Sequence, residues 1–105
     1  MNDINNVNKI IEKECDKLKN LLIQKNTDYG NSAINPLRIF SSASSLEQIK
    51  VRMDDKLSRI KNLQEKENKV KSETIEDTMF DLAGYIILYF VAKNIQGKNN
   101  DVRNG

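Results

Sequence analysis

Apolar residues in this chain of 105 residues recur at intervals of three and four in three separate stretches, which is the spacing of one face of an α-helix. Residues 3–24 are predicted to form the first helix, with a stripe of Ile4, Val7, Ile11, Cys15, Leu18 and Leu22. A second helix over residues 46–64 has the stripe Leu46, Ile49, Met53, Leu57 and Ile60. A third over residues 74–96 has the stripe Ile75, Met79, Leu82, Ala83, Ile86 and Phe90. The predicted fold class is therefore all-α, with three main helices.

Two helix starts carry the spacing of a capping box. Ser44 and Glu47 stand at the start of the second helix, and Thr74 and Asp77 stand at the start of the third. A charged connector is predicted between these helices, over residues 61–72.

The stretch between the first two helices, residues 25–45, is rich in Asn, Asp, Gly and Ser and is predicted to be a long loop. Asn35 suits a helix cap and Pro36 suits a first helical position, so a short helical turn is expected over residues 36–40. Loops this long in a small domain are more often functional than not.

A chain of this length forms one domain at most, predicted over residues 1–96, followed by a flexible polar tail over residues 97–105. The net charge of +2 is too balanced to indicate a nucleic-acid or membrane-surface binder, so an anion site would have to be local. No signal peptide is evident, and the apolar run 82–92 is too short to span a bilayer. We therefore expect a soluble intracellular protein with no membrane partner.

The residue inventory limits the chemistry. The chain has no histidine, and its single cysteine, Cys15, has no second thiol for an internal disulfide or a thiolate metal cluster. An oxygen-liganded cation such as Mg²⁺ is the metal that this inventory suits.

The third predicted helix is apolar nearly all round in its C-terminal half, because Ile87, Leu88 and Val91 lie away from its main stripe. Two other short helices can hardly cover such a surface. We expect this helix to meet its counterpart in a second subunit, so that oligomerisation completes the helical bundle. The alternative is that the tail or the long loop folds over it.

Glu14 projects into the apolar face of the first predicted helix, where an unpaired carboxylate would be costly. It would need a cation, a metal or a raised pKa there. Alternatively it lies at the edge of the stripe and pairs with a lysine of another helix.

Three cations and one carboxylate share one flank of the second predicted helix: Arg52, Asp55, Lys56 and Arg59. Arg forks match phosphate oxygens and Lys adds a point charge, so this flank is a candidate phosphate cradle. A solvated salt-bridged face is the alternative.

Asp77 and Asp81 lie one turn apart, and Gly84 follows on the same side with no side chain to block a close approach. Two carboxylates so placed are able to share a divalent cation, or they stabilise the N-terminal end of the helix through its dipole. In the loop, Tyr29 beside Gly30 offers a plate on which a base could stack, with its phosphate on Arg38. A lid on the core with a turn at Gly30 is the alternative use of that pair.

Three segments together resemble a small helical phage family called nucleotide-modification-associated domain one. They are residues 25–30 (Lys-Asn-Thr-Asp-Tyr-Gly), residues 52–59 (Arg-Met-Asp-Asp-Lys-Leu-Ser-Arg) and residues 76–85 (Glu-Asp-Thr-Met-Phe-Asp-Leu-Ala-Gly-Tyr). The resemblance implies an all-helical fold, a phage or prophage origin, a place in the host cytoplasm and a nucleotide ligand.

A more distant similarity, to all-helical nucleoside triphosphate pyrophosphatases, implies Mg²⁺-dependent release of pyrophosphate by a cluster of four acids. The chain departs from that pattern, because Asp77 and Asp81 are spaced too widely and no clean facing Glu pair is present. A site that keeps cationic and aromatic residues without a full metal cluster is what a binding protein would retain.

The leading hypothesis is thus a protein that captures nucleotides without a cofactor and without turnover, in the manner of phage proteins that sequester host second messengers to counter defence. Its binding residues would be Tyr29, Gly30, Arg38, Arg52, Asp55, Lys56, Arg59, Asp81 and Tyr85. The alternatives are a Mg²⁺ pyrophosphatase, with Glu14, Asp55, Asp77 and Asp81 as metal ligands, and a helical protein-interaction module.

Overall fold

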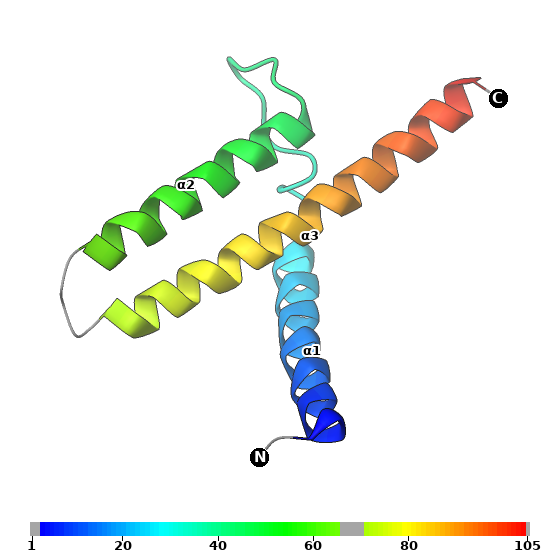
Figure 1. Ribbon diagram of the computed structural model, residues 1–105. Helices are drawn as coiled ribbons and strands as arrows, with labels where there is room; N and C mark the ends of the chain where they lie inside the picture. The colour runs from blue at the N-terminus through cyan, green and yellow to red at the C-terminus, as the bar shows by residue number, and fades with distance from the viewer. Residues whose placement is uncertain (1–2, 66–70, 105) are drawn as a thin grey trace.

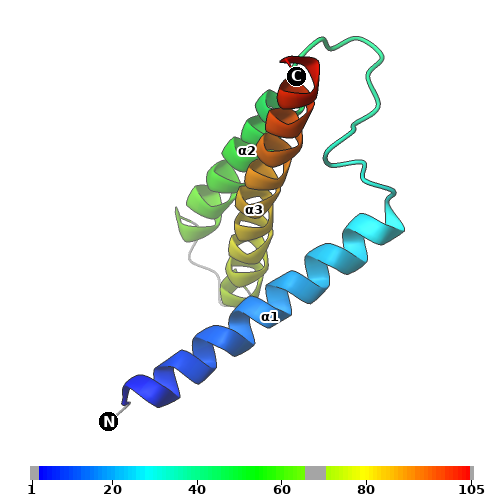
Figure 2. The ribbon, with the colours of Figure 1, turned by 90° about the vertical axis from the view of Figure 1, so that its right-hand side faces the viewer.

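A computed structural model describes residues 3–65 and 71–104 of the chain. It contains three helices, α1 (Ile4–Asp28), α2 (Ser45–Glu65) and α3 (Lys71–Asn104), and no strand among the described residues (Figure 1). The helices α2 and α3 lie side by side, and α1 crosses α3 and projects away from the pair (Figure 2). The predicted all-α fold with three main helices is confirmed.

α1 begins and ends at identifiable caps. The Asp3 carboxylate accepts a hydrogen bond from the backbone N–H of Asn6 at 2.8 Å, and the backbone N–H of Tyr29 donates to the Lys25 carbonyl at 2.9 Å. The helix therefore runs one turn past its predicted end at residue 24. The signal that ends it is the left-handed backbone of Gly30 and Asn31, with φ of 59° and 63°.

The long loop connects α1 to α2 without the helical turn predicted over residues 36–40, which was wrong. The Arg38 guanidinium instead donates to the Ala43 carbonyl and, at 3.1 Å, to Ser45 Oγ. Ser45 Oγ in turn donates to the Ile34 carbonyl at 2.6 Å, and Ile34 is buried. These bonds hold the loop against the start of α2 and satisfy the Ala43 and Ile34 carbonyls without a helix.

Ser44 caps α2, as the sequence predicted, because its Oγ accepts the Glu47 backbone N–H at 3.1 Å. The return bond of the capping box is replaced by a contact along the helix, in which Lys50 Nζ donates to the Glu47 carboxylate at 3.2 Å. That hydrogen bond raises the pKa of Lys50 above its ordinary value.

Replacing Ser44 with alanine should lower the free energy of unfolding by about 0.5–2 kcal/mol, because the Glu47 N–H loses its side-chain acceptor. Urea unfolding followed by far-UV circular dichroism measures this loss. Ser42→Ala, in the exposed loop before the helix, is the matched control and should change stability by less than about 0.5 kcal/mol. Equal losses in both variants would mean that the Ser44 hydroxyl does not stabilise the start of α2.

The core lies between α2, α3 and the loop. Ile49 of α2, Ala92 of α3 and Ile34 of the loop are its buried apolar residues, with Ile49 only 1% exposed. Leu46, Met53, Tyr85, Leu88 and Tyr89 pack against them. The predicted core stripe of α2 is thus confirmed at its first three positions.

The predicted core stripe of α3 was wrong at three of its six positions, whereas Ile75, Leu82 and Ala83 are partly buried. Met79, Ile86 and Phe90 are exposed, whereas Tyr85, Leu88, Tyr89 and Ala92 lie toward the core. A helix that is apolar nearly all round gives no periodic signal for which side packs, so the choice depends on the partner helix.

The ends of α3 also differ from the prediction. The helix already includes Thr74, so this residue is inside the helix rather than at its cap, and the helix continues past Gly97 to Asn104. The predicted connector 61–72 is helical at residues 61–65 and 71–72, and its remaining part lies outside the described residues. The flexibility of the tail stays a prediction.

α1 contacts the rest of the chain mainly through its C-terminal half. Leu18, Leu22 and Asn26 are partly covered, whereas Ile4, Val7, Ile10 and Ile11 are exposed. The molecule is correspondingly extended, with axes of 54 × 37 × 23 Å and a radius of gyration of 17.1 Å. None of the helices, over the residues described, combines the length and apolar character needed to cross a bilayer.

Candidate nucleotide site

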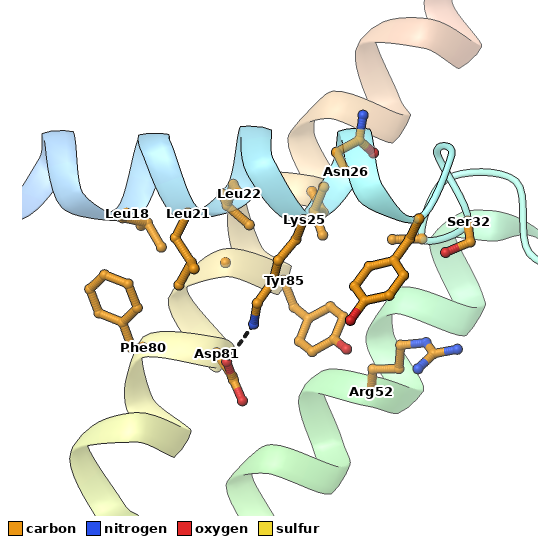
Figure 3. Close-up of a pocket in the computed structure, with 14 residues that line it drawn as sticks. Leu18, Leu21, Leu22, Lys25, Asn26, Ser32, Arg52, Phe80, Asp81 and Tyr85 are labelled. Atoms are coloured by element: carbon orange, nitrogen blue, oxygen red, sulfur yellow. Dashed lines mark ion pairs between the residues drawn. The ribbon is translucent and has the colours of Figure 1, made fainter. Parts of the chain in front are cut away.

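A pocket of about 380 Å³ lies where α1 crosses the α2–α3 pair (Figure 3). Its apolar wall comes chiefly from α1 and α3, through Leu18, Leu21, Leu22, Phe80 and Leu88. Its polar lining comes from all three helices and the loop, through Lys25, Asn26, Tyr29, Ser32, Arg52, Asp81 and Tyr85. We call this site the tyrosine pocket.

The end of α1 positions Tyr29 at this pocket. Tyr29 is the C-cap residue, and the left-handed residues Gly30 and Asn31 turn the chain immediately after it. The Asn26 side-chain amide donates to Asn31 Oδ1 at 2.6 Å and so fixes the turn. Tyr29 is exposed, which leaves its ring free to contact a ligand.

Gly84 sets the distance between α1 and α3 beside the pocket. A Cβ atom at this position would lie 3.0 Å from Leu22 Cδ2 and 4.0 Å from Leu18 Cδ1. The absence of a side chain therefore lets α1 cross close to α3, which brings Lys25 and Tyr29 to the same site as Tyr85. The sequence predicted a close approach at Gly84, and here it is the leucines of α1 that approach.

Asp81 carries the negative charge of the tyrosine pocket and lies between two lysines. Its carboxylate oxygens are 3.7 Å from Lys25 Nζ and 3.6 Å from Lys56 Nζ, and Figure 3 shows the first of these ion pairs. The Asp81 side chain is 38% exposed, so each pair contributes little to stability, up to about 1 kcal/mol. The pairs nevertheless hold two ammonium groups beside the pocket, next to Arg52 of its lining.

The structure brings together part of the predicted binding set. Tyr29, Arg52, Asp81 and Tyr85 all line the tyrosine pocket, and Lys56 reaches its edge through Asp81. These residues come from the three segments that carry the family resemblance, so the resemblance grouped residues that are far apart in the sequence. Their binding role stays a prediction.

The other predicted binding residues do not line this pocket. Arg38 is bonded within the loop to Ala43 and Ser45, and Gly30 acts as the turn after α1. Asp55 and Arg59 are exposed on α2, outside the pocket lining. Of the four residues in the phosphate cradle predicted along one flank of α2, Arg52 lines the pocket and Lys56 reaches its edge.

The proposed metal ligands Glu14, Asp77 and Asp81 are not drawn together. Among residues 3–65 and 71–104, no group of three or more acidic or Cys side chains is placed to hold a metal ion. Glu14 was expected to project into an apolar face, but it is exposed, as are the residues before it in α1. Asp77 is exposed too, and the Asp81 carboxylate is paired with lysines. The described residues thus hold no preformed cluster of the four acids that the pyrophosphatase alternative requires.

Sequence reasoning missed Lys25, Phe80 and the leucines of α1 as parts of the site. A signal for Lys25 was present, because it precedes Tyr29 by four residues and so lies on the same face at the end of α1. No such signal existed for Phe80, whose place depends on how α1 crosses α3. Lys17 Nζ also lies over the Phe80 ring in a cation–π contact, 5.5 Å from the ring centroid.

Comparison with known proteins places the chain in a family. Neither a search of curated proteins nor a search of solved structures finds a match for it. The family model described as nucleotide modification associated domain 1 matches residues 25–92. This range includes the end of α1, the loop, all of α2 and most of α3, and it holds all the polar residues of the tyrosine pocket. The chain belongs to the nucleotide modification associated domain 1 family.

Proposed function

We propose that this protein binds a nucleotide in the tyrosine pocket and captures it without turnover. The observation that carries the proposal is the convergence of two tyrosines, an arginine and a lysine from separate segments on one pocket: Tyr29, Tyr85, Arg52 and Lys25. Aromatic rings stack on any base, and guanidinium groups match phosphate oxygens in pairs of hydrogen bonds. The name of the family agrees with this chemistry.

The charge of the site favours an anion. Lys25 and Lys56 form ion pairs with the Asp81 carboxylate and Arg52 lines the same pocket, so the four groups together carry a surplus of positive charge. A phosphate entering the pocket competes with Asp81 for the two ammonium groups, whereas no acidic side chain among the described residues forms an ion pair with Arg52. Arg52 is therefore the residue to which we assign the main phosphate contact.

The volume of the pocket suits one small ligand. At about 380 Å³ it lies near the lower end of the usual range for small-molecule sites, which is roughly 300–1,000 Å³. One base with its sugar and phosphate fits this space, and a larger ligand would extend beyond it.

The biological role that we propose is sequestration of a host nucleotide second messenger by a phage-encoded protein in the host cytoplasm, which would counter antiviral signalling. A homo-oligomer formed through α3 is part of this proposal. It is supported by the exposed apolar side chains of α3, Ile86, Ile87, Phe90, Val91 and Ile95.

Ligand depletion tests capture directly. The protein at high concentration is mixed with nucleoside triphosphates, monophosphates and cyclic dinucleotides in the presence of Mg²⁺, and the free small molecules are quantified before and after heat denaturation. We expect one nucleotide to be depleted in proportion to the protein and to return intact on heating.

The other hypotheses give different results in the same experiment. Catalytic appearance of monophosphate and pyrophosphate would establish the pyrophosphatase and overturn capture. No depletion of any nucleotide would favour the helical interaction module instead.

A further inference from the structure

A groove of about 620 Å³ lies on the other side of α1 from the tyrosine pocket, between α1 and the C-terminal half of α3. Its lining is mainly apolar and includes Leu22 and Ile23 of α1 and Ile87, Val91 and Ile95 of α3. Several of these side chains are exposed, with Ile23 at 61%. We call this surface the apolar groove.

The N-terminal half of α1 is a second surface with exposed apolar side chains. Its stripe, Ile4, Val7 and Ile11, continues the line of Leu18 and Leu22, but these three side chains are exposed. The N-terminal half of α1 projects away from the α2–α3 pair (Figure 2). A helix whose apolar stripe is covered over only half its length needs a partner for the other half.

The accessible surface area of the chain is larger than that of a compact monomer of the same mass. The chain exposes 8597 Å², whereas a compact monomer of 12.1 kDa exposes roughly 6,000 Å². The radius of gyration of 17.1 Å likewise exceeds the roughly 13 Å of a compact domain of this length. The excess of about 2,600 Å² is larger than the roughly 800 Å² that each partner buries in a standard stable interface.

We propose that two copies of this chain exchange the N-terminal halves of their α1 helices, each lying in the apolar groove of the other. The two α1 helices then run antiparallel about a two-fold axis near Cys15. In this register Val7 of each copy lies opposite Ile23 of its partner helix, and Cys15 lies opposite its own counterpart. The proposal does not depend on which ligand the tyrosine pocket binds. It gives the homo-oligomer proposed above one specific arrangement, in which the partner's α1 rather than its α3 covers Ile87, Val91 and Ile95.

The symmetry of this arrangement agrees with the apolar pattern. A two-fold axis perpendicular to an antiparallel helix pair keeps the stripes of both helices on the same side of the pair. The stripe through Ile4, Val7 and Ile11 of one copy therefore faces the same direction as Leu18 and Leu22 of the other. That direction is where α3 lies, so the exposed half-stripe meets Ile87, Val91 and Ile95.

The test is the mass of the protein in solution, measured by size-exclusion chromatography with light scattering over a wide range of concentrations. We expect twice the chain mass for the wild type, and the single chain mass for Ile11→Asp, which puts a charge into the groove. Asn20→Asp is the matched control, since it introduces the same side chain about half a turn away around α1 and should remain dimeric. A monomeric wild type, or a dimer that Ile11→Asp leaves intact, would overturn the proposal.

Cross-linking through Cys15 tests the register without a destabilising substitution. Cys15 is exposed and is the only cysteine of the chain. Because both Cys15 side chains point along the two-fold axis, their Cα atoms lie about as far apart as the helix axes, roughly 8–10 Å, which is too far for a disulfide. A short bis-maleimide spans that distance, and each of its two double bonds adds one thiol, with the sulfur bonded to one carbon and the thiol proton passing to the other. We expect a cross-linked dimer from dilute wild type, and none from Cys15→Ser or Ile11→Asp. No cross-link in the wild type would exclude an axis near Cys15.

Discussion

Replacing Ile49 with alanine should lower the free energy of unfolding by about 2–5 kcal/mol. Ile49 is 1% exposed and lies between Ile34 of the loop and Ala92 of α3, so its truncation leaves a cavity where α2, α3 and the loop meet. Because few other apolar side chains are buried, little packing remains to compensate, and the loss is a large share of the stability of a small domain.

Urea unfolding at one fixed protein concentration measures this loss, because association also adds to apparent stability. Val51→Ala is the control, since Val51 lies two residues away in α2 and is 58% exposed. It should change stability by less than about 0.5 kcal/mol. A comparable loss at both positions would mean that the core does not lie where the structure places it.

Arg52→Ala should weaken binding of the captured nucleotide by about 10- to 150-fold, which corresponds to about 1.5–3 kcal/mol for a charged hydrogen bond to phosphate. Arg52 is the arginine of the tyrosine pocket, where it lies with Tyr85 and the Asp81–Lys25 pair. Isothermal titration of the nucleotide that the wild type depletes gives the affinity.

Arg59→Ala provides the comparison, because Arg59 is also an exposed arginine of α2 but is outside the pocket lining. Its affinity should match that of the wild type within about twofold, since only long-range charge is lost. If both variants lose affinity equally, the phosphate lies along the flank of α2 rather than in the pocket. If neither does, Arg52 does not contact phosphate.

Local signals in the sequence were sufficient for both ends of α2 and for the start of α1. The Ser44 cap and the stripe through Ile49 predicted α2 closely, because capping and periodicity depend on neighbouring residues alone. The helical turn predicted over residues 36–40 is absent because hydrogen bonds of Arg38 and Ser45 hold the loop to α2 instead. Those bonds depend on tertiary contact, which local sequence signals do not report.

The candidate site was predictable in part for a similar reason. Tyr29, Arg52, Asp81 and Tyr85 were identified from residue type and family resemblance, and all four line the tyrosine pocket. Which face of α3 packs against α2 could not be read from a helix that is apolar nearly all round. The exclusion of Arg38 and Arg59 from the pocket likewise depends on where α1 crosses α3.

The crossing of α1 over α3 has a thermodynamic consequence. Leu18, Leu22 and Leu88 line both the tyrosine pocket and the apolar groove, so one seam of side chains separates the two spaces. A shift of α1 that widens one space narrows the other. If the pocket binds the proposed nucleotide and the groove a second copy, the two events are expected to be coupled: by linkage, the ligand changes the free energy of self-association by the same amount as self-association changes that of ligand binding.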